Sequence, residues 1–299
     1  MKYLITGGTG FVGQHLVKEL LSSNHEVSVL ARDIEKAQEQ LGPQVTVIHW
    51  PDVYSDFEIE SNEFDCVINL MGANIAGKKW SNERKKVLYN SRVDGTRNLI
   101  EKLDAKNISV KKFVQASAIG IYDEKSDVIF EDSPVENDFL GKLCQDWEKQ
   151  LTDRKDNYAI LRFGMVLGKD GGAMKKMLPA FKLGLGGKLG SGKFYMSWIH
   201  IQDLVHMLIK ASQDENMNGV YNAVSQYPVT NKEFTNVLSD LLQRPAVFKV
   251  PKTMLQLVLG EMSQVLLADL RVKSKRIKEV KFVFTYPTIE NALKEVVSK

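Results

Sequence analysis

The feature that most constrains this chain is a set of three glycines near its start. Gly7, Gly10 and Gly13 follow the apolar run 2–6 and precede residues 11–21, where apolar side chains recur at helical spacing. A Gly-x-x-Gly-x-x-Gly turn between a strand and a helix is typical of a unit that binds a dinucleotide. We therefore predict that the chain begins with such a unit.

Each glycine has a physical role in this prediction. Gly7 permits the tight turn, Gly10 leaves out the Cβ that would block the pyrophosphate, and Gly13 lets the helix pack closely on the sheet. The first helical turn, which includes Phe11 and Val12, then presents free N–H groups and a partial positive charge to the phosphates. An ordinary glycine-rich turn is the alternative, and the strand and helix that flank the loop disfavour it.

Strands and helices continue to alternate through the first half of the chain. The expected strands are the apolar segments 26–31, 45–49, 65–70, 112–116 and 158–162. The expected helices are 34–41, 82–103 and 139–151. Short connections between alternating strands and helices predict a doubly wound parallel sheet, the Rossmann fold, with helices on both faces.

The regular alternation of strands and helices ends after Arg162, where glycine-rich segments and a mixture of expected strands and helices follow. We predict an α/β protein with two parts. Residues 1–165 form the Rossmann domain, to which later segments at about 195–225 return. Residues 166–299 form a smaller mixed α/β C-terminal lobe that binds the substrate.

Composition excludes several classes of function. The chain carries 40 basic and 37 acidic residues, a balance that does not favour nucleic-acid binding. Its two cysteines and five histidines show no metal-ligand spacing, so we expect no metal. No apolar stretch reaches the roughly 20 residues of a membrane span, and the apolar start is too short for a signal peptide. We expect a cytoplasmic protein with a small-molecule substrate and no nucleic-acid or membrane partner. A homodimer is a further hypothesis.

The end of the second strand bears on the choice of nucleotide. Sheets that bind NAD(H) usually carry an acidic residue there, which binds the 2′-hydroxyl of the ribose. Here Arg32 occupies that place, and a guanidinium can bind a 2′-phosphate through two hydrogen bonds. Asp33 is the rival, since it could bind the hydroxyl instead, and an exposed Arg32 at a strand end is the plainer alternative. We favour NADP(H) over NAD(H).

Several further segments resemble the extended short-chain dehydrogenase/reductase superfamily. They are residues 69–73, 91–99, 116–122, 161–164, 197–204 and 220–223. A closer similarity connects the chain to the atypical "epimerase family" branch of NAD-dependent epimerase/dehydratase-like proteins. It rests on residues 171–179, 185–187, 196–200, 259–262 and 284–287. This resemblance covers nearly the whole chain.

The resemblance implies a Rossmann domain of the extended type with the branch's own small C-terminal lobe over the cofactor. It implies that Leu70 and Gly72, after the fourth long strand, contact the cofactor. It implies no particular substrate.

One part of the superfamily pattern is missing. Extended reductases carry Tyr-x-x-x-Lys on the helix before the sixth strand, where the tyrosine is the general acid/base and the lysine lowers its pKa and holds the nicotinamide ribose. Alignment on Glu148 places Leu140 at the tyrosine position and Cys144 at the lysine position. Arg92 stands where many relatives carry asparagine. Leucine transfers no proton and cysteine supplies no fixed cation, so the usual relay is absent.

Other residues are candidates for the missing chemistry. Ser117 is the candidate to bind a substrate oxygen. If the loop between this position and Tyr122 has no insertion relative to typical members of the superfamily, Ala118 takes that place instead. Tyr122 is a candidate proton donor, with a structural tyrosine as the alternative. Arg162 ends a strand at the carboxyl edge of the sheet, where ligands bind, and is a candidate cofactor contact. A salt bridge to a neighbouring loop is its alternative role.

Three residues of the segment 197–204 have two interpretations each. His200 and Asp203 are either site residues or the cap of a helix, and we favour the cap. Trp198 either stacks on a substrate or fills the interface between the two parts of the chain.

Two hypotheses of function follow. The first is an NADP(H)-dependent oxidoreductase or nucleotide-sugar-epimerase-like enzyme with a non-standard site that lacks Tyr-x-x-x-Lys. The second is a non-catalytic NADPH-binding sensor or regulatory module.

Overall fold

The computed structural model describes residues 1–124, 127–154 and 157–298. Its centre is a seven-stranded parallel sheet in the order β13-β8-β7-β5-β1-β2-β3. The strands are β1 (Lys2–Thr6), β2 (Glu26–Ala31), β3 (Thr46–His49), β5 (Cys66–Asn69), β7 (Phe113–Ala118), β8 (Tyr158–Phe163) and β13 (Gly219–Ala223). The predicted Rossmann sheet is therefore confirmed.

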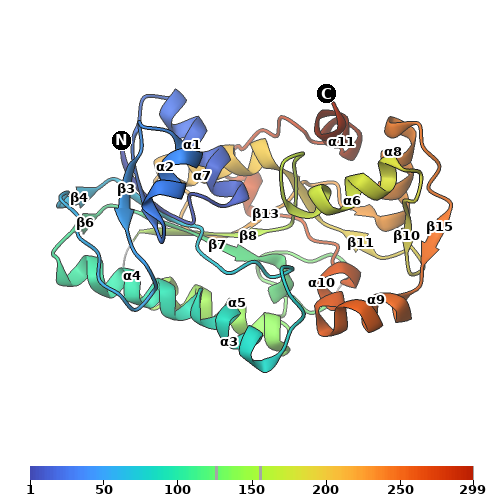
Figure 1. Cartoon of the computed structure of the whole chain (residues 1–299), viewed down its shortest axis with the longest axis horizontal. Coiled ribbons are helices and arrows are strands. Elements are labelled where there is room, and N and C mark those ends of the chain that lie inside the picture. Colours follow the sequence, from blue (N-terminus) through green and yellow to red (C-terminus); the bar gives the residue numbers. More distant parts are fainter. Residues whose placement is uncertain (125–126, 155–156, 299) are drawn as a thin grey trace.

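Helices cover both faces of this sheet, with α1, α2 and α7 on one face and α4 and α5 on the other (Figure 1). Their bounds are α1 (Phe11–Ser22), α2 (Ile34–Leu41), α3 (Asn82–Asn90), α4 (Val93–Ala105), α5 (Phe139–Thr152) and α7 (Ile201–Gln213). Because both faces are buried, the central strands are apolar along their length. Tyr3, Leu4 and Ile5 of β1 are fully buried although they alternate between faces.

One prediction about the helices is wrong. Residues 82–103 were expected to form one helix, and the structure has two, α3 and α4, which meet at Ser91 and Arg92. The Ser91 hydroxyl accepts the N–H of Ala73, 3.0 Å away, and donates to the Leu88 carbonyl at 3.1 Å. Ser91 therefore contacts the loop after β5 at the point where the helix breaks. The spacing of apolar residues along the sequence could not reveal this break.

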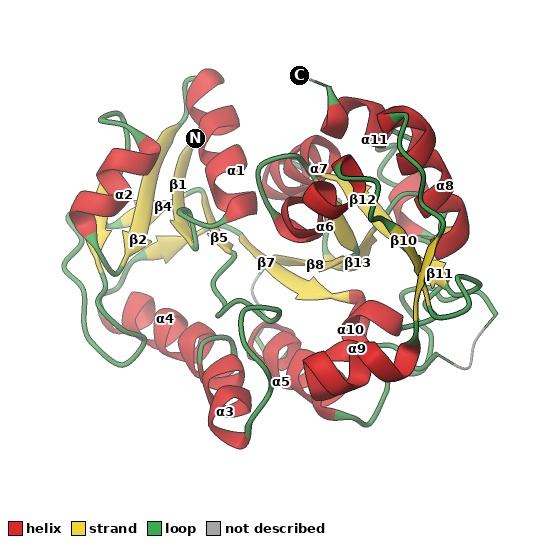
Figure 2. Cartoon of the chain, turned by 45° about the vertical axis from the view of Figure 1, so that its right-hand side comes forward, coloured by secondary structure: helices red, strands yellow, loops and turns green. Residues whose placement is uncertain are grey.

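The C-terminal lobe is a mixed α/β region built around helices α6, α8 and α11 (Figure 2). Its helices are α6 (Gly172–Lys182), α8 (Asn231–Leu242), α9 (Lys252–Leu259), α10 (Ser263–Leu267) and α11 (Ile289–Val297). Short strand pairs join β9 (Met165–Leu167) to β12 (Trp198–His200), β10 (Gly187–Leu189) to β15 (Phe248–Val250), and β11 (Tyr195–Met196) to β14 (Val229–Thr230). In the other half of the molecule β4 (Glu63–Phe64) pairs with β6 (Ser109–Val110). The 3-10 helices are η1 (Ile119–Ile121), η2 (Gly260–Met262) and η3 (Arg276–Lys278).

The chain enters the lobe and comes back to the sheet before it ends. Strand β13 pairs with β8 along five residues, from Gly219 to Ala223, and so forms one edge of the central sheet. Helix α7 packs against α1. The strands run so that β7 points toward the lobe, which places the lobe next to the carboxyl ends of the strands (Figure 2). Among the described residues no helix is long and apolar enough to cross a membrane.

Candidate functional site

The glycine loop lies between the end of β1 and the start of α1, as the sequence predicts. Gly7 adopts a positive φ of 70°, and a Cβ there would come within 2.6 Å of the Leu70 carbonyl oxygen. A Cβ on Gly13 would lie 2.3 Å from the carbonyl oxygen of Gly7. Both glycines are therefore required by close approach of backbone to backbone. The same contacts show that the glycine loop abuts the loop that follows β5.

Gly10 differs from its two neighbours in the motif. A Cβ there would meet only the Gly7 carbonyl oxygen, at 3.1 Å, and is otherwise unobstructed. Within the described parts of the chain no hydrogen-bond acceptor takes the N–H groups of Phe11, Val12 and Gly13, and the first turn of α1 carries no acidic residue. Open space beside free donors at the positive end of a helix is a cradle that fits a diphosphate.

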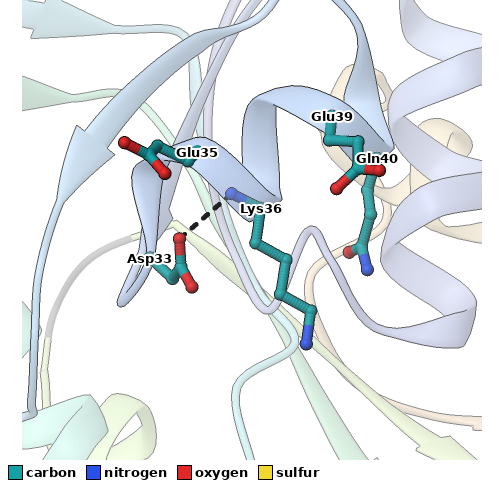
Figure 3. Close-up of a pocket in the computed structure, with 5 residues that line it drawn as sticks. All are labelled: Asp33, Glu35, Lys36, Glu39 and Gln40. Atoms are coloured by element: carbon teal, nitrogen blue, oxygen red, sulfur yellow. Dashed lines mark hydrogen bonds between the residues drawn. The ribbon is translucent and has the colours of Figure 1, made fainter.

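The end of β2 separates the two candidates for the ribose. Asp33 caps α2, and its carboxylate accepts the Lys36 backbone N–H at 3.0 Å (Figure 3). Arg32 is exposed. A hollow of about 530 Å³ at the start of α2 is lined by Asp33, Glu35, Lys36, Glu39 and Gln40. Because carboxylates dominate this hollow, it does not itself suit a phosphate. The exposed guanidinium of Arg32 has no hydrogen-bond or ion-pair partner among the described residues, so it can meet a phosphate.

The carboxyl ends of β1 and β5 meet at the point where the order of the strands reverses. The chain runs outward from β1 through β2 to β3 and then crosses to β5 on the other side of β1. Ligands of open α/β sheets bind in the crevice at such a switch point. Half-buried Leu70 and exposed Gly72 follow β5 there, next to the glycine loop.

A buried hydrogen-bond network holds these strand ends in place. Asn69 accepts a hydrogen bond from the Thr6 hydroxyl at 2.7 Å and donates to the Thr96 hydroxyl at 2.8 Å. The Trp147 indole N–H also donates to Thr96, at 2.9 Å. Sequence reasoning did not single out these residues, although Asn69 begins one of the segments that carry the family resemblance. The network joins β1, β5, α4 and α5 beneath the site.

A second buried network contains three of the residues predicted to act in the site. The Ser117 hydroxyl donates to Glu148 Oε1 at 2.6 Å. Arg162 donates through Nε and Nη2 to the two oxygens of Glu148, at 2.8 and 2.6 Å, and through Nη1 to the Tyr122 hydroxyl, at 2.7 Å. Tyr122 in turn donates to Asn222 Oδ1 at 2.6 Å. All five side chains are buried.

These contacts favour the structural alternatives for that network. The guanidinium of Arg162 forms an ion pair with Glu148 of α5 rather than with a neighbouring loop, which does not support its expected contact with the cofactor. Burial lowers the pKa of Arg162, but the hydrogen bonds and charge of Glu148 raise it more. Burial raises the pKa of Tyr122 to about 12, so its hydroxyl is a poor proton donor near neutral pH. The catalytic roles of Ser117 and Tyr122 stay predictions.

The positions of the missing tyrosine and lysine both lie on α5. Leu140 packs toward η1, where a Cβ on Gly120 would be 3.6 Å from its Cδ1 atom. Cys144 is buried, and burial raises the pKa of its thiol to about 12. The thiol is therefore neutral at ordinary pH, and neither position holds a proton relay.

The segment 197–204 forms structural contacts. His200 caps α7, accepting the Gln202 N–H at 3.3 Å, while its Nε2 lies 2.9 Å from Glu295 Oε2 of α11. Asp203 accepts the backbone N–H groups of Thr285 and Tyr286, and Trp198 is fully buried in the core of the lobe. Among the described residues no group of three or more His, Cys, Asp or Glu side chains could hold a metal ion.

Comparisons of sequence place these features in a family. The profile of the NAD dependent epimerase/dehydratase family matches residues 3–223, and a domain of unknown function (DUF1731) matches residues 250–296. The chain is 35% identical to the chloroplastic "epimerase family protein SDR39U1 homolog" of Arabidopsis thaliana, over 99% of this chain and 86% of that protein. It is 31% identical to an epimerase family protein of Staphylococcus epidermidis, over 99% of each.

Comparisons of structure agree with those of sequence. The crystal structure of human epimerase family protein SDR39U1 (isoform 2) with NADPH superposes with a TM-score of 0.88 and 31% identity, over 99% of each chain. A nucleoside-diphosphate sugar epimerase from Corynebacterium glutamicum superposes with a TM-score of 0.74 and 27% identity, over 99% of this chain and 58% of that one. The fold is that of an extended short-chain dehydrogenase/reductase. The chain belongs to the NAD dependent epimerase/dehydratase family, among the epimerase family proteins that resemble SDR39U1.

Proposed function

We propose that this chain is an NADP(H)-dependent oxidoreductase or epimerase-like protein whose active site lacks the Tyr-x-x-x-Lys relay. The observation that carries the proposal is the open cradle at Gly10, where the N–H groups of Phe11, Val12 and Gly13 have no acceptor within the described residues. The human relative that was crystallised with NADPH supports the choice of cofactor.

Different residues of this chain would bind different parts of the cofactor. The amides at the start of α1 would bind the diphosphate, and Arg32 would bind the 2′-phosphate. Leu70 and Gly72 would border the half of the cofactor that carries the nicotinamide. When bound, NADPH supplies a hydride at its nicotinamide ring. The protein's own side chains would have to orient the substrate and supply any proton.

The lack of a proton donor on α5 limits which substrates could accept the hydride. Reduction of a simple ketone generates an alkoxide, which needs a proton donor, and neither Leu140 nor the neutral thiol of Cys144 supplies one. A quinone or a similarly electron-poor carbonyl gives a weakly basic anion, which can take its proton later from water. We therefore expect quinone-type acceptors to react faster than simple ketones or aldehydes.

Calorimetric titration with NADPH and with NADH tests the cofactor assignment. We expect the wild-type protein to bind NADPH more tightly than NADH. Arg32→Ser should lower the ratio of the two affinities about tenfold, since a charge-assisted hydrogen bond contributes about 1.5–3 kcal/mol. Lys36→Ser, one turn into α2, is the matched control. If the folded wild-type protein binds neither nucleotide, the proposal is wrong.

Single-turnover oxidation of NADPH tests the reaction itself. The protein is mixed with stoichiometric NADPH and with a quinone, an aldehyde, a ketone or a nucleotide sugar, and the absorbance of the reduced nicotinamide is followed. Turnover with the quinone at a higher rate than with the ketone supports the expected order. Absence of turnover with the whole panel rejects the enzymatic hypothesis.

The non-catalytic hypothesis is favoured by one observation of its own. Ser117 and Tyr122 are both engaged in the buried network around Glu148 and Arg162, so the two candidate catalytic hydroxyls have other partners. This hypothesis predicts NADPH binding without turnover and a protein partner that is recovered only when NADPH is present. Identical recovery of partners with and without NADPH contradicts it.

A further inference from the structure

The loop that follows β5 leads from the cradle at the start of α1 to the lobe. It begins at Leu70, whose carbonyl oxygen lies against the glycine loop. Farther along, Arg84 of α3 donates through Nη2 to the Asn74 carbonyl. Two residues later, Lys176 of α6 donates to the Ala76 carbonyl at 2.8 Å. Arg84 therefore holds the stretch of loop between the cradle and the lobe, at the carboxyl edge of the sheet, where open α/β sheets bind their ligands.

The guanidinium of Arg84 has unused hydrogen-bond donors. Of its three nitrogen atoms, only Nη2 has an acceptor among the described residues. Its Nε is buried and has no hydrogen-bond partner there. No carboxylate of residues 1–124, 127–154 and 157–298 forms an ion pair with Arg84. A buried donor without an acceptor is destabilising, above all on a charged group, and a ligand oxygen would supply the acceptor. The side chain is only half-buried, so a ligand can reach it.

The surroundings of Arg84 are strongly basic. Residues 74–86 contain five basic residues and one acidic residue. Among the described residues, Lys85 has a counter-ion, Glu261 of η2. Burial and the charge of Arg84 both lower the pKa of Arg92, so a second guanidinium lies near the first. Uncompensated positive charges beside a ligand site raise the local concentration of anions.

Exposed lysines by themselves are an ordinary solvated surface, and Lys78, Lys79 and Lys86 are of this kind. Arg84 differs from them because it is half-buried, lacks an acceptor at Nε and bonds to the loop that joins the cradle to the lobe. We propose that Arg84 binds an oxyanion of the substrate, a carboxylate or a phosphate group. The planar fork of donors on arginine matches two oxygens of such a group. This inference rests on the proposed function, because it places an acidic substrate beside bound NADPH.

Binding of small anions to the NADPH-saturated protein tests the proposal. Saturation with NADPH keeps the anions out of the cradle at the start of α1. Pyrophosphate represents a phosphate group and citrate a carboxylate, and potassium chloride holds the ionic strength constant. Dissociation constants are measured by calorimetry for the wild-type protein, Arg84→Gln and Arg84→Lys. Lys86→Gln is the matched control, because it removes the same charge from an exposed position on the same helix.

We expect Arg84→Gln to weaken the binding of one of the two anions about tenfold, and that anion identifies the acidic group of the substrate. Arg84→Lys keeps the charge and should lose less, whereas Lys86→Gln should change the dissociation constant less than about twofold. The NADPH affinity, the circular dichroism spectrum and the thermal midpoint of every variant should stay close to those of the wild type.

Equal losses in Arg84→Gln and Lys86→Gln would show a diffuse effect of charge and overturn the assignment. The same holds if the wild-type protein binds neither anion, or if Arg84→Gln loses as much affinity for NADPH as for the anion. These outcomes leave the proposed function intact as long as the wild-type protein binds NADPH, and if it does not, the proposed function itself fails. If Arg84→Gln does not fold, Arg84→Lys decides, and anion affinity equal to that of Lys86→Gln overturns the proposal.

Discussion

At the scale of single residues, the clearest feature is how Glu148 organises its surroundings. Its two carboxylate oxygens accept both Ser117 and the paired N–H groups of Arg162, and all three side chains are buried. A charge pair removed from water is stable only when its remaining donors and acceptors are also satisfied. Tyr122 and Asn222 complete that requirement on the Arg162 side. The network therefore ties β7, α5, β8 and β13 together.

Replacing Arg162 tests whether the network is structural. Arg162→Met leaves Glu148 buried without a counter-ion, so we expect the free energy of unfolding to fall by about 3–5 kcal/mol. Urea denaturation followed by circular dichroism measures it. Lys111→Met is the control, because Lys111 is exposed and the loss of its ion pair with half-buried Asp65 should cost less than about 1 kcal/mol. A folded Arg162→Met protein of normal stability that no longer binds NADPH would instead support the cofactor contact predicted from the sequence.

The buried imidazole of His200 predicts a dependence of stability on pH. Burial lowers the pKa of His200, although the nearby carboxylate of Glu295 opposes the shift. Because the folded-state pKa lies below the unfolded value of about 6.5, the unfolded chain takes up the proton first. The contribution of His200 is fully present above about pH 6.5 and is lost as the pH falls through the folded-state pKa.

Thermal unfolding at about pH 7.5 and about pH 5.5 measures this effect. The wild-type midpoint should fall on acidification, and the fall should be smaller in His200→Gln, which cannot take up the proton. His15 also has its pKa lowered by burial, so part of the wild-type dependence should survive in that variant. An identical fall in both proteins would show that His200 does not contribute.

At the scale of elements, the turn from β1 into α1 combines two separable requirements. A Cβ on Gly13 would overlap the backbone of Gly7 and Gly8, whereas a Cβ on Gly10 would point into open space apart from one carbonyl oxygen. One glycine therefore serves the packing of the helix on the sheet, and the other serves access of a ligand to the helix amides.

Two alanine variants separate these requirements. Gly13→Ala should lower the free energy of unfolding by about 1–3 kcal/mol or more, because backbone has to move to accept the methyl group. Gly10→Ala should unfold nearly as the wild type does but should lose NADPH affinity, since its methyl group occupies the cradle. Urea denaturation and calorimetry on each variant make the comparison. If Gly10→Ala binds NADPH normally, the diphosphate does not lie at this cradle.

At the scale of the whole molecule, the central sheet is completed by segments that come after the start of the lobe in the sequence. Strand β13 and helix α7 belong to the central layers, yet both follow the first elements of the lobe in the chain. Further contacts join the two parts, including the ion pair of Lys85 in α3 with Glu261 and the bond from Lys176 Nζ to the Ala76 carbonyl at 2.8 Å. We therefore expect one cooperative unfolding unit.

Expression of fragments tests this expectation. A fragment of residues 1–165 lacks β13 and α7, so one edge of β8 and the face of α1 that packs against α7 are exposed, and we expect it to be unfolded or aggregated. The full chain should show coincident urea transitions by far-UV circular dichroism and by tryptophan fluorescence. A well-folded fragment 1–165, or two separated transitions in the full chain, would contradict the single unit.

The sequence alone determined the parallel sheet, the glycine loop and the absence of the Tyr-x-x-x-Lys pair. These depend on local signals: apolar strand runs, glycine spacing, helical periodicity, and residue types at fixed distances along one helix. The tertiary structure alone decided the break between α3 and α4 and the burial of Ser117, Tyr122 and Arg162 around Glu148. Each of these depends on contacts between segments far apart in the sequence, and no local pattern encodes which polar partner a buried side chain will find.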